Sequence, residues 1–311
     1  MFPCSNPELV AAVSEAGGIG VVQPVSLTFV HGYDFRDGLR YIRRLTARPI
    51  GLNALIEASA RSYHQRTVRF VEVALEEGVR FFVTSLGNPR WVCDLVHAAG
   101  GVVYHDVTER KWALKARDGG VDGFIAVNRE AGGHAGSRDP RALLDELQDL
   151  ARPVVAAGGV GDATAFAARL REGYAGVQMG TRFIATVECS ASAAYKDAIV
   201  RARADDIVLT ERLSGVPVAV IRTPYIERLG TRVGPVARWL FTGRRSKKWI
   251  RAWYALRSAV SLKRSLGASD AGRDYWQAGR SVAGITAVLP AGEIVRACEA
   301  AWREDAAVPA V

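Results

Sequence analysis

The chain has 311 residues, of which 49% are hydrophobic and 23% charged, so it can form a large core and is not globally disordered. Its formal net charge is +9, and its four cysteines form no CxxC pair, which argues against a zinc site or a disulfide framework. No apolar run reaches the roughly 18 residues that a membrane span needs, and no basic-then-apolar signal sequence opens the chain. We therefore expect a cytoplasmic protein that has neither a metal site nor a membrane span.

The first predicted element is a helix in "SNPELVAAVSEAGG" (5–18). Asn6 is a candidate N-cap, and Pro7 suits the first helical position. This helix precedes every predicted strand. In a fold of repeated strand–helix units, that order indicates that the first unit lacks its strand, because the gene product starts further upstream or because the chain is shortened.

Seven short apolar segments then alternate with amphipathic ones, and their starts recur every 22 to 31 residues. They are 18–23, 49–55, 79–85, 101–107, 123–128, 153–159 and 175–180. Continuously apolar strands that each precede a helix are typical of a parallel sheet buried on both faces. We predict a (β/α)8 TIM barrel that lacks its first strand. A doubly wound open sheet is disfavoured because no GxGxxG motif follows the first strand.

In such a barrel, the active site lies at the carboxyl ends of the strands. The polar residues expected there are Asn53, Thr84, Ser85, His105 and Asp106. His134 follows segment 123–128 in "EAGGHAG" (130–136). Glycines on both sides leave this imidazole open to a ligand that approaches the backbone closely. A histidine satisfied within its own loop is the alternative.

Two glycine-rich turns follow the last two strands, in "AAGGVGD" (156–162) and "GVQMGTRF" (176–183). Each turn opens a helix, where free N–H groups and the positive end of the helix dipole attract anions. Two such turns late in a barrel are typical of a phosphate site. We expect a phosphate-bearing ligand, with Gln178 and Thr181 as further polar contacts. Tight turns that bind nothing are the alternative.

Several of these motifs, in this order and at these spacings, resemble the nitronate monooxygenase (2-nitropropane dioxygenase-like) flavoproteins. They are "SNPELVAAVSEAGGIGVV", "PIGLNAL", "EAGGHAG", "AAGGVGD" and "GVQMGTRFIATVE". The match covers about residues 1–190, and "YWQAGRSVAGI" with "PAGEIV" (275–295) is similar to the family's closing segment. The resemblance implies a TIM barrel that binds FMN non-covalently. It also implies kinship with flavin-dependent enoyl-acyl-carrier-protein reductases and NADH:quinone reductases.

The resemblance also implies roles for individual residues. The FMN phosphate would lie on Gly158, Gly159, Gln178, Met179, Gly180 and Thr181, and the flavin would contact Asn53 and Gly132. His134 matches the family's catalytic histidine. Its imidazole would hold the negative charge of an alkyl nitronate, or take the α-proton of a nitroalkane as general base. The flavin would pass the electrons to dioxygen, and the products would be a carbonyl compound and nitrite.

The sequence departs from the family pattern at two places. Val127, Asn128 and Arg129 replace the usual run before the glycine–histidine motif. Some relatives have a lysine near the flavin at the end of the fourth strand, where this chain has His105 and Asp106. A cation that stabilises reduced, anionic flavin would then have to come from His105 or from an arginine.

The resemblance and the chain pattern predict three regions. Residues 1–190 form the FMN-binding barrel, 191–270 form an inserted helical lid subdomain over its mouth, and 271–311 pack back on the barrel. Thr210, Arg212 and Arg222 could face the pocket or lie on the surface. The basic segment 243–264, with interleaved aromatics, could bind nucleic acid or a membrane surface, but a solvated outer helix is favoured.

The predicted function is FMN-dependent oxidation of alkyl nitronates by dioxygen, without a nucleic-acid partner and with a homodimer left open. The alternative with the same cofactor is an NAD(P)H oxidoreductase that reduces a quinone or an enoyl thioester. A flavin-free barrel for a sugar phosphate is disfavoured because no Schiff-base lysine or carboxylate pair stands at the strand ends. A non-catalytic module on nucleic acid or membrane is also disfavoured, and it would bind in a strongly salt-dependent way.

Overall fold

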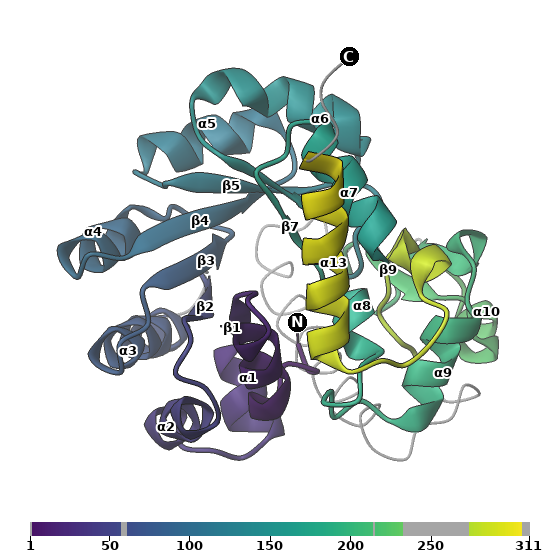
Figure 1. Ribbon diagram of the computed structural model, residues 1–311, viewed down its shortest axis with the longest axis horizontal. Coiled ribbons are helices and arrows are strands. Elements are labelled where there is room, and N and C mark those ends of the chain that lie inside the picture. The colour runs from purple at the N-terminus through teal and green to yellow at the C-terminus, as the bar shows by residue number, and fades with distance from the viewer. Residues whose placement is uncertain (1, 57–60, 214, 233–273, 307–311) are drawn as a thin grey trace.

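The computed structural model describes residues 2–56, 61–213, 215–232 and 274–306. Its centre is a curled sheet of seven parallel strands that lie side by side in chain order (Figure 1). They are β1 (Gly20–Val22), β2 (Ile50–Leu55), β3 (Phe81–Ser85), β4 (Val102–Val107), β5 (Gly123–Val127), β6 (Val154–Ala157) and β7 (Gly176–Gln178). All seven predicted strands are confirmed. A doubly wound sheet reverses its strand order at a switch point, and the described sheet has no such reversal.

Helices follow the strands and cover the outer side of the curve (Figure 1). They are α2 (Phe35–Leu45), α3 (Arg61–Glu76), α4 (Arg90–Ala98), α5 (Arg110–Asp118), α6 (Pro140–Leu147) and α7 (Ala163–Arg171), with short helical turns η1 (Ser26–Val30) and η2 (Gln148–Leu150). The main core lies between these two layers, where helix residues such as Leu39 and Ile42 pack with strand residues such as Leu52 and Phe82. Each fully buried side chain of this kind contributes about 1.5–3 kcal/mol. Apolar burial therefore holds the layers together.

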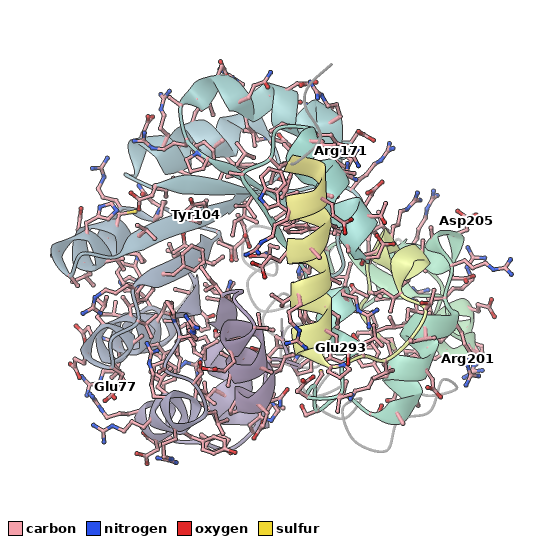
Figure 2. The ribbon with its side chains drawn as sticks, in the orientation of Figure 1. Glu77, Tyr104, Arg171, Arg201, Asp205 and Glu293 are labelled. Carbon is pink, nitrogen blue, oxygen red and sulfur yellow. The ribbon has the colours of Figure 1, made fainter. Side chains whose placement is uncertain are left out.

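The inner face of the sheet carries the alternate residues of each strand. Val83 and Ile125 are buried there, and the rings of Phe81 and Tyr104 lie tilted with centroids 5.4 Å apart (Tyr104 is labelled in Figure 2). Glycine makes room for these rings, since a Cβ on Gly123 would lie 2.2 Å from Tyr104. The side-chain period of two in a strand therefore decides which residues line the inside.

Helices α1 (Pro7–Glu15) and α13 (Ala291–Ala306) lie between the two ends of the sheet, and α13 packs against both α7 and α1 (Figure 1). The predicted helix with Pro7 in its first turn is confirmed. Asn6, however, makes no side-chain cap. Its amide donates to the Glu188 carbonyl (2.9 Å) and accepts from the Ser190 N–H (3.2 Å), which ties the start of the chain to the segment after β7.

The segment after β7 continues with short elements. They are α8 (Thr181–Ile184), α9 (Ala193–Arg201), η3 (Ala204–Asp206), the antiparallel pair β8 (Ile207–Thr210) and β9 (Val218–Ile221), α10 (Pro224–Leu229) and η4 (Arg280–Gly284). Thr210 is buried and its hydroxyl donates to the Gly230 carbonyl, whereas Arg212 and Arg222 are exposed. Of the two locations considered for these arginines, the structure therefore supports the protein surface and not the pocket. The basic segment 243–264 lies outside the described residues.

The described residues contain neither a candidate membrane span nor a candidate metal cluster. None of the helices there is both long and apolar enough to cross a bilayer. Within the same residues, no group of three or more histidine, cysteine or acidic side chains is arranged to hold a metal ion.

Candidate functional site

The loop that carries His134 begins at Asn128, directly after β5. Asn128 is fully buried. Its side-chain Oδ1 accepts from the Glu130 N–H (2.8 Å), and its side-chain Nδ2 donates to the Gly158 carbonyl (3.2 Å). The loop is thereby fixed to the turn that follows β6. From the sequence, Asn128 was notable only because it differs from the family motif at this position. The structure shows that it positions the loop.

Two further contacts clamp the same loop. Gly133 has a φ of +69° and pairs with Ala219 of β9, whose N–H donates to the Gly133 carbonyl at 2.7 Å. Gly132 packs against the C-terminal segment, where a Cβ on Gly279 would lie only 2.6 Å from the Gly132 nitrogen and 2.5 Å from the Glu130 carbonyl oxygen. The glycines around His134 therefore serve close backbone packing as well as access.

This packing predicts the effect of Gly279→Ala. Gly279 has a φ of −101°, which alanine adopts without strain, so the added methyl acts only by pushing the backbone of the His134 loop. We expect a loss of about 1–3 kcal/mol in the free energy of unfolding, measured by urea denaturation. Gly292→Ala in α13 is the matched control, because its Cβ would meet only the flexible Arg296 side chain and alanine favours a helix. Equal stability of the two variants would contradict the clamp.

His134 itself is exposed to solvent, yet the protein around it lowers the pKa of its imidazole through desolvation. Exposure and a desolvation-lowered pKa occur together when one side of the ring faces solvent and the other sides face protein. With a pKa below its usual value of about 6.5, the imidazole is neutral at pH 7 and offers one donor and one acceptor nitrogen. It can therefore donate a hydrogen bond to an oxyanion or accept a proton.

The glycine turn after β6 lies beside this loop. Gly158 and Gly159 have φ values of +119° and +82°, and a Cβ on either would collide with Asn128 or Glu130. Loop packing and backbone conformation thus explain both glycines, which the sequence assigned to phosphate access. The Glu130 carboxylate beside Gly159 pairs with Arg169 at 3.3 Å, so its negative charge is balanced.

The backbone donors expected at the two turns are available. In the part of the chain that the structure describes, the N–H groups of Gly159 and Gly180 donate no hydrogen bond to the protein. Gln178 and Met179 are partly accessible, and Gly180 is exposed. These residues can reach a bound anion.

Thr181 differs from the expectation. Its side chain is buried, and its hydroxyl oxygen accepts a hydrogen bond from the Gly279 N–H at 3.0 Å. The hydroxyl thus holds the C-terminal segment against the start of α8. The structure therefore gives Thr181 a packing role in place of a free polar contact.

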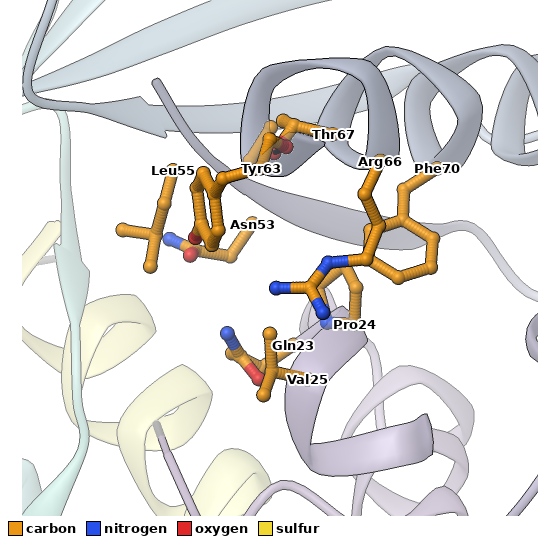
Figure 3. A pocket seen from close by; sticks show the side chains of 10 residues that line it. Gln23, Pro24, Val25, Asn53, Leu55, Tyr63, Arg66, Thr67 and Phe70 are labelled. Atoms are coloured by element: carbon orange, nitrogen blue, oxygen red, sulfur yellow. Dashed lines mark hydrogen bonds between the residues drawn. The ribbon is translucent and has the colours of Figure 1, made fainter. Parts of the chain in front are cut away.

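Asn53 lies on the inner face of β2 and is partly accessible. It lines a small pocket with Gln23, Pro24, Val25, Ala54, Leu55, Tyr63, Arg66, Thr67 and Phe70 (Figure 3). Figure 3 shows the guanidinium of Arg66 reaching over the pocket from α3, and this group stacks 5.2 Å from the centroid of the Tyr63 ring. Among the described residues, no carboxylate forms an ion pair with Arg66. No local sequence motif marks this arginine, although it lies on the helix directly after β2.

The structure does not bring all predicted site residues into contact. The His134 loop, the Gly158–Gly159 turn and the start of α8 pack together, whereas within the described residues no hydrogen bond joins Asn53 to them. Asn53 shares with them only the inner, carboxyl edge of the sheet. A ligand that touches both groups must therefore extend across this edge.

His105 corrects one expectation from the sequence. It faces the helical layer, is 5% exposed, and its Nδ1 lies 2.8 Å from the Thr84 hydroxyl. Burial lowers the pKa of His105 to about 4. The suggestion that His105 supplies a cation beside a flavin is therefore wrong, because the ring is neutral and points away from the inner face. Asp106, the next residue, faces inward.

The same burial predicts a pH dependence of stability. Below pH 6.5 the unfolded chain protonates His105 while the folded chain does not, so stability is present above pH 6.5 and is lost as the pH falls toward 4. Between pH 7 and pH 4.5 this group should cost about 2.5 kcal/mol. Urea unfolding of His105→Asn should show a smaller loss than the wild type over this range. Parallel losses in the two proteins would refute the assignment.

The chain is similar to known proteins over most of its length. The family model described as nitronate monooxygenase matches residues 1–298. A Mycobacterium tuberculosis protein named (3aS,4S,5R,7aS)-5-hydroxy-7a-methyl-1-oxo-octahydro-1H-indene-4-carboxyl-CoA dehydrogenase is 33% identical over 229 residues, which cover 72% of this chain and 62% of that protein. A probable nitronate monooxygenase of Staphylococcus aureus is 26% identical over 278 residues, covering 76% and 77% of the two chains.

A solved structure is similar over nearly the whole chain. The structure of FabK from Thermotoga maritima matches with a TM-score of 0.79 and 29% sequence identity, covering 98% of this chain and 91% of that one. The match to the M. tuberculosis protein, in contrast, spans less than two thirds of that relative's length.

Proposed function

Because this chain belongs to the nitronate monooxygenase family of flavin-dependent oxidoreductases, we propose that it binds FMN and that His134 contacts its substrate. One observation carries this proposal. A neutral, accessible imidazole is held by a clamped glycine loop at the carboxyl edge of a parallel sheet. That edge is where strand–helix folds of this kind place their chemistry.

The residues present fit the FMN phosphate. The unpaired N–H groups of Gly159 and Gly180 are suitable donors, and Gly180 precedes the first turn of α8. Gly158, Gln178 and Met179 would line the same position, Thr181 would support the turn from beneath, and Gly132 and Asn53 would contact the ring system. Bound FMN would supply the two-electron acceptor for the substrate.

The first candidate substrate is an alkyl nitronate, with dioxygen as the second substrate and a carbonyl compound and nitrite as products. A nitronate carries its negative charge on the nitro oxygens. The N–H of neutral His134 can donate a hydrogen bond to one of them, and its other nitrogen can accept the α-proton of a neutral nitroalkane. The family model that matches residues 1–298 supports this candidate.

The second candidate is a thioester: an enoyl thioester reduced with NAD(P)H as the electron donor, or an acyl thioester oxidised with a separate electron acceptor. Charge then develops on the thioester carbonyl oxygen, and the same imidazole N–H can stabilise it. The identity to the CoA-thioester dehydrogenase is 33%, compared with 26% to the S. aureus nitronate monooxygenase, and this difference favours the second candidate.

An anaerobic titration followed in the visible spectrum tests both candidates. The FMN-loaded protein is mixed in separate cuvettes with propyl-2-nitronate, with NADPH or NADH, and with butyryl-CoA. Bleaching by the nitronate alone supports the first candidate, and bleaching by the nicotinamide or by the thioester supports the second. A protein that retains no FMN, or whose FMN none of these compounds reduces, would contradict the proposed function.

The finer architecture belongs to the same proposal. We propose that the seven strands are seven of the eight in a (β/α)8 TIM barrel, that residues 191–270 form a lid inserted after 1–190, and that 271–311 close the fold. The contact of Gly279 with the His134 loop supports the last of these assignments. We also propose a cytoplasmic location, which the four free, buried cysteines support. Size-exclusion chromatography with light scattering will decide between a monomer and a homodimer.

A further inference from the structure

Asp106 is a partly buried carboxyl, and no group among the described residues forms a hydrogen bond with it. It lies on the inner face of β4, paired in register with Ile125 of β5. Its side chain is only partly accessible, its Oδ1 atom is completely covered, and no hydrogen bond reaches that atom. Buried polar atoms are nearly always paired, because an unpaired one costs folding free energy. An unpaired atom on the inner face of the sheet therefore points to a ligand that would pair with it.

The position of Asp106 agrees with that expectation. The two glycine turns that would hold the FMN phosphate follow β6 and β7, and Asn53 lies on β2. In the sheet order, β3, β4 and β5 separate these two groups. A ligand that contacts both extends along the inner edge of the intervening strands, and Asp106 is near the carboxyl end of the middle one.

The surroundings of Asp106 favour its neutral form. Burial raises the pKa of this carboxyl to about 7, and the positive charge of the chain terminus acts weakly in the opposite direction. The inner-face residues of the neighbouring strands carry no charge: Phe81, Val83 and Ser85 on β3, and Ile125 and Val127 on β5. On β4 itself, Val102 is uncharged, and Tyr104 has a pKa raised by burial and is also neutral. A protonated carboxyl is a hydrogen-bond donor, whereas a carboxylate can only accept.

We propose that the protonated carboxyl of Asp106 donates a hydrogen bond to an acceptor atom of the FMN isoalloxazine ring. This inference rests on the FMN binding proposed above and gives the ring a specific partner on β4. The position that a cation would occupy to stabilise reduced, anionic flavin then holds an acid that is neutral at low pH and anionic at high pH. FMN binding should therefore weaken as this carboxyl ionises.

The test is the affinity of the apo-protein for FMN, measured by flavin fluorescence quenching from pH 6 to pH 8. In the wild type, the protonated fraction of a group with a pKa of about 7 falls about tenfold over this range, so the dissociation constant should rise about tenfold. Asp106→Asn keeps the shape of the side chain and a donor, so its affinity should not show that rise. Ionisation of the FMN phosphate affects both proteins equally and cancels in the comparison.

Asp149→Asn is the matched control, since Asp149 is an exposed aspartate paired with Arg110 on the outer surface. It should reproduce the wild-type pH profile. A second readout needs no variant: calorimetry at pH 8 in buffers of different ionisation enthalpy should detect uptake of about one proton as wild-type FMN binds. That readout stands even if Asp106→Asn fails to fold.

Two results would overturn the inference. Identical pH profiles for wild type and Asp106→Asn, together with no proton uptake at pH 8, would remove Asp106 from the flavin site while FMN binding itself stood. Failure of the wild type to bind FMN at every pH would overturn the proposed function and this inference with it. A tenfold rise that is lost only in Asp106→Asn would establish the contact.

Discussion

His134→Ala is expected to leave FMN bound while slowing flavin reduction by the substrate on the order of 10²- to 10⁴-fold. The imidazole is the neutral donor and acceptor at the accessible end of the clamped loop, and it contributes no hydrogen bond to the loop's backbone pairing. Removal of the ring should therefore take away charge stabilisation and proton transfer but not the fold. Stopped-flow absorbance of the FMN-loaded variant under anaerobic conditions measures the rate.

A matched control is His64→Ala, which removes an exposed histidine of α3 whose ring makes an edge contact with Trp91. Its reduction rate should equal that of the wild type. If His134→Ala reduced its flavin at the wild-type rate with every compound that reduces the wild type, His134 would have no part in the reaction. A variant that lost FMN would indicate a role in binding instead.

The strands could be predicted from the sequence because the apolar segments are short, regularly spaced and separated by amphipathic helices. The apolar character of these segments, however, does not indicate which of their residues face inward. In a parallel sheet buried on both faces, strand residues are apolar on either side, so the pattern does not mark the two faces. His105 and Asp106 are neighbours in the sequence, and only the structure shows that one joins the helical core and the other faces the site.

The site was predictable where a motif is local and unpredictable where a contact joins distant parts of the chain. The glycines around His134 pointed to an open loop, and that loop lies at the carboxyl edge of the sheet. Its clamp depends on Ala219 and Gly279, far along the chain, and no local pattern indicates them. Likewise, Gly158 and Gly159 indicated a turn with positive φ values, but the sequence did not show that atoms of the neighbouring loop approach them closely.

The phosphate assignment leads to the second large expected effect, for Gly180→Asp. Gly180 has ordinary helical-region torsions, with φ −110° and ψ −67°, so an L-residue fits its backbone without strain. It also occupies the N-cap position of α8, where aspartate is a preferred residue and no side chain caps the helix now. The substitution should therefore leave the fold intact.

FMN binding should nevertheless be lost. A carboxylate at Gly180 would lie within a few ångströms of the proposed phosphate and would compete for the same N–H groups. At that separation near a protein surface, two like charges repel by about 4 kcal/mol, so the affinity should fall on the order of 1,000-fold. Equilibrium dialysis against FMN measures the affinity, and circular dichroism checks the fold.

Gly180→Ala separates charge from size, because it adds a Cβ but no charge. We expect it to retain most of the FMN affinity, so that Gly180→Asp and Gly180→Ala differ by the electrostatic effect alone. Gly159→Ala would be a poorer test, since a φ of +82° and a close approach to Glu130 would strain the backbone and confuse folding with binding. A Gly180→Asp protein that stayed yellow through dialysis would place the phosphate elsewhere, and the donor set of the two turns would then need another ligand.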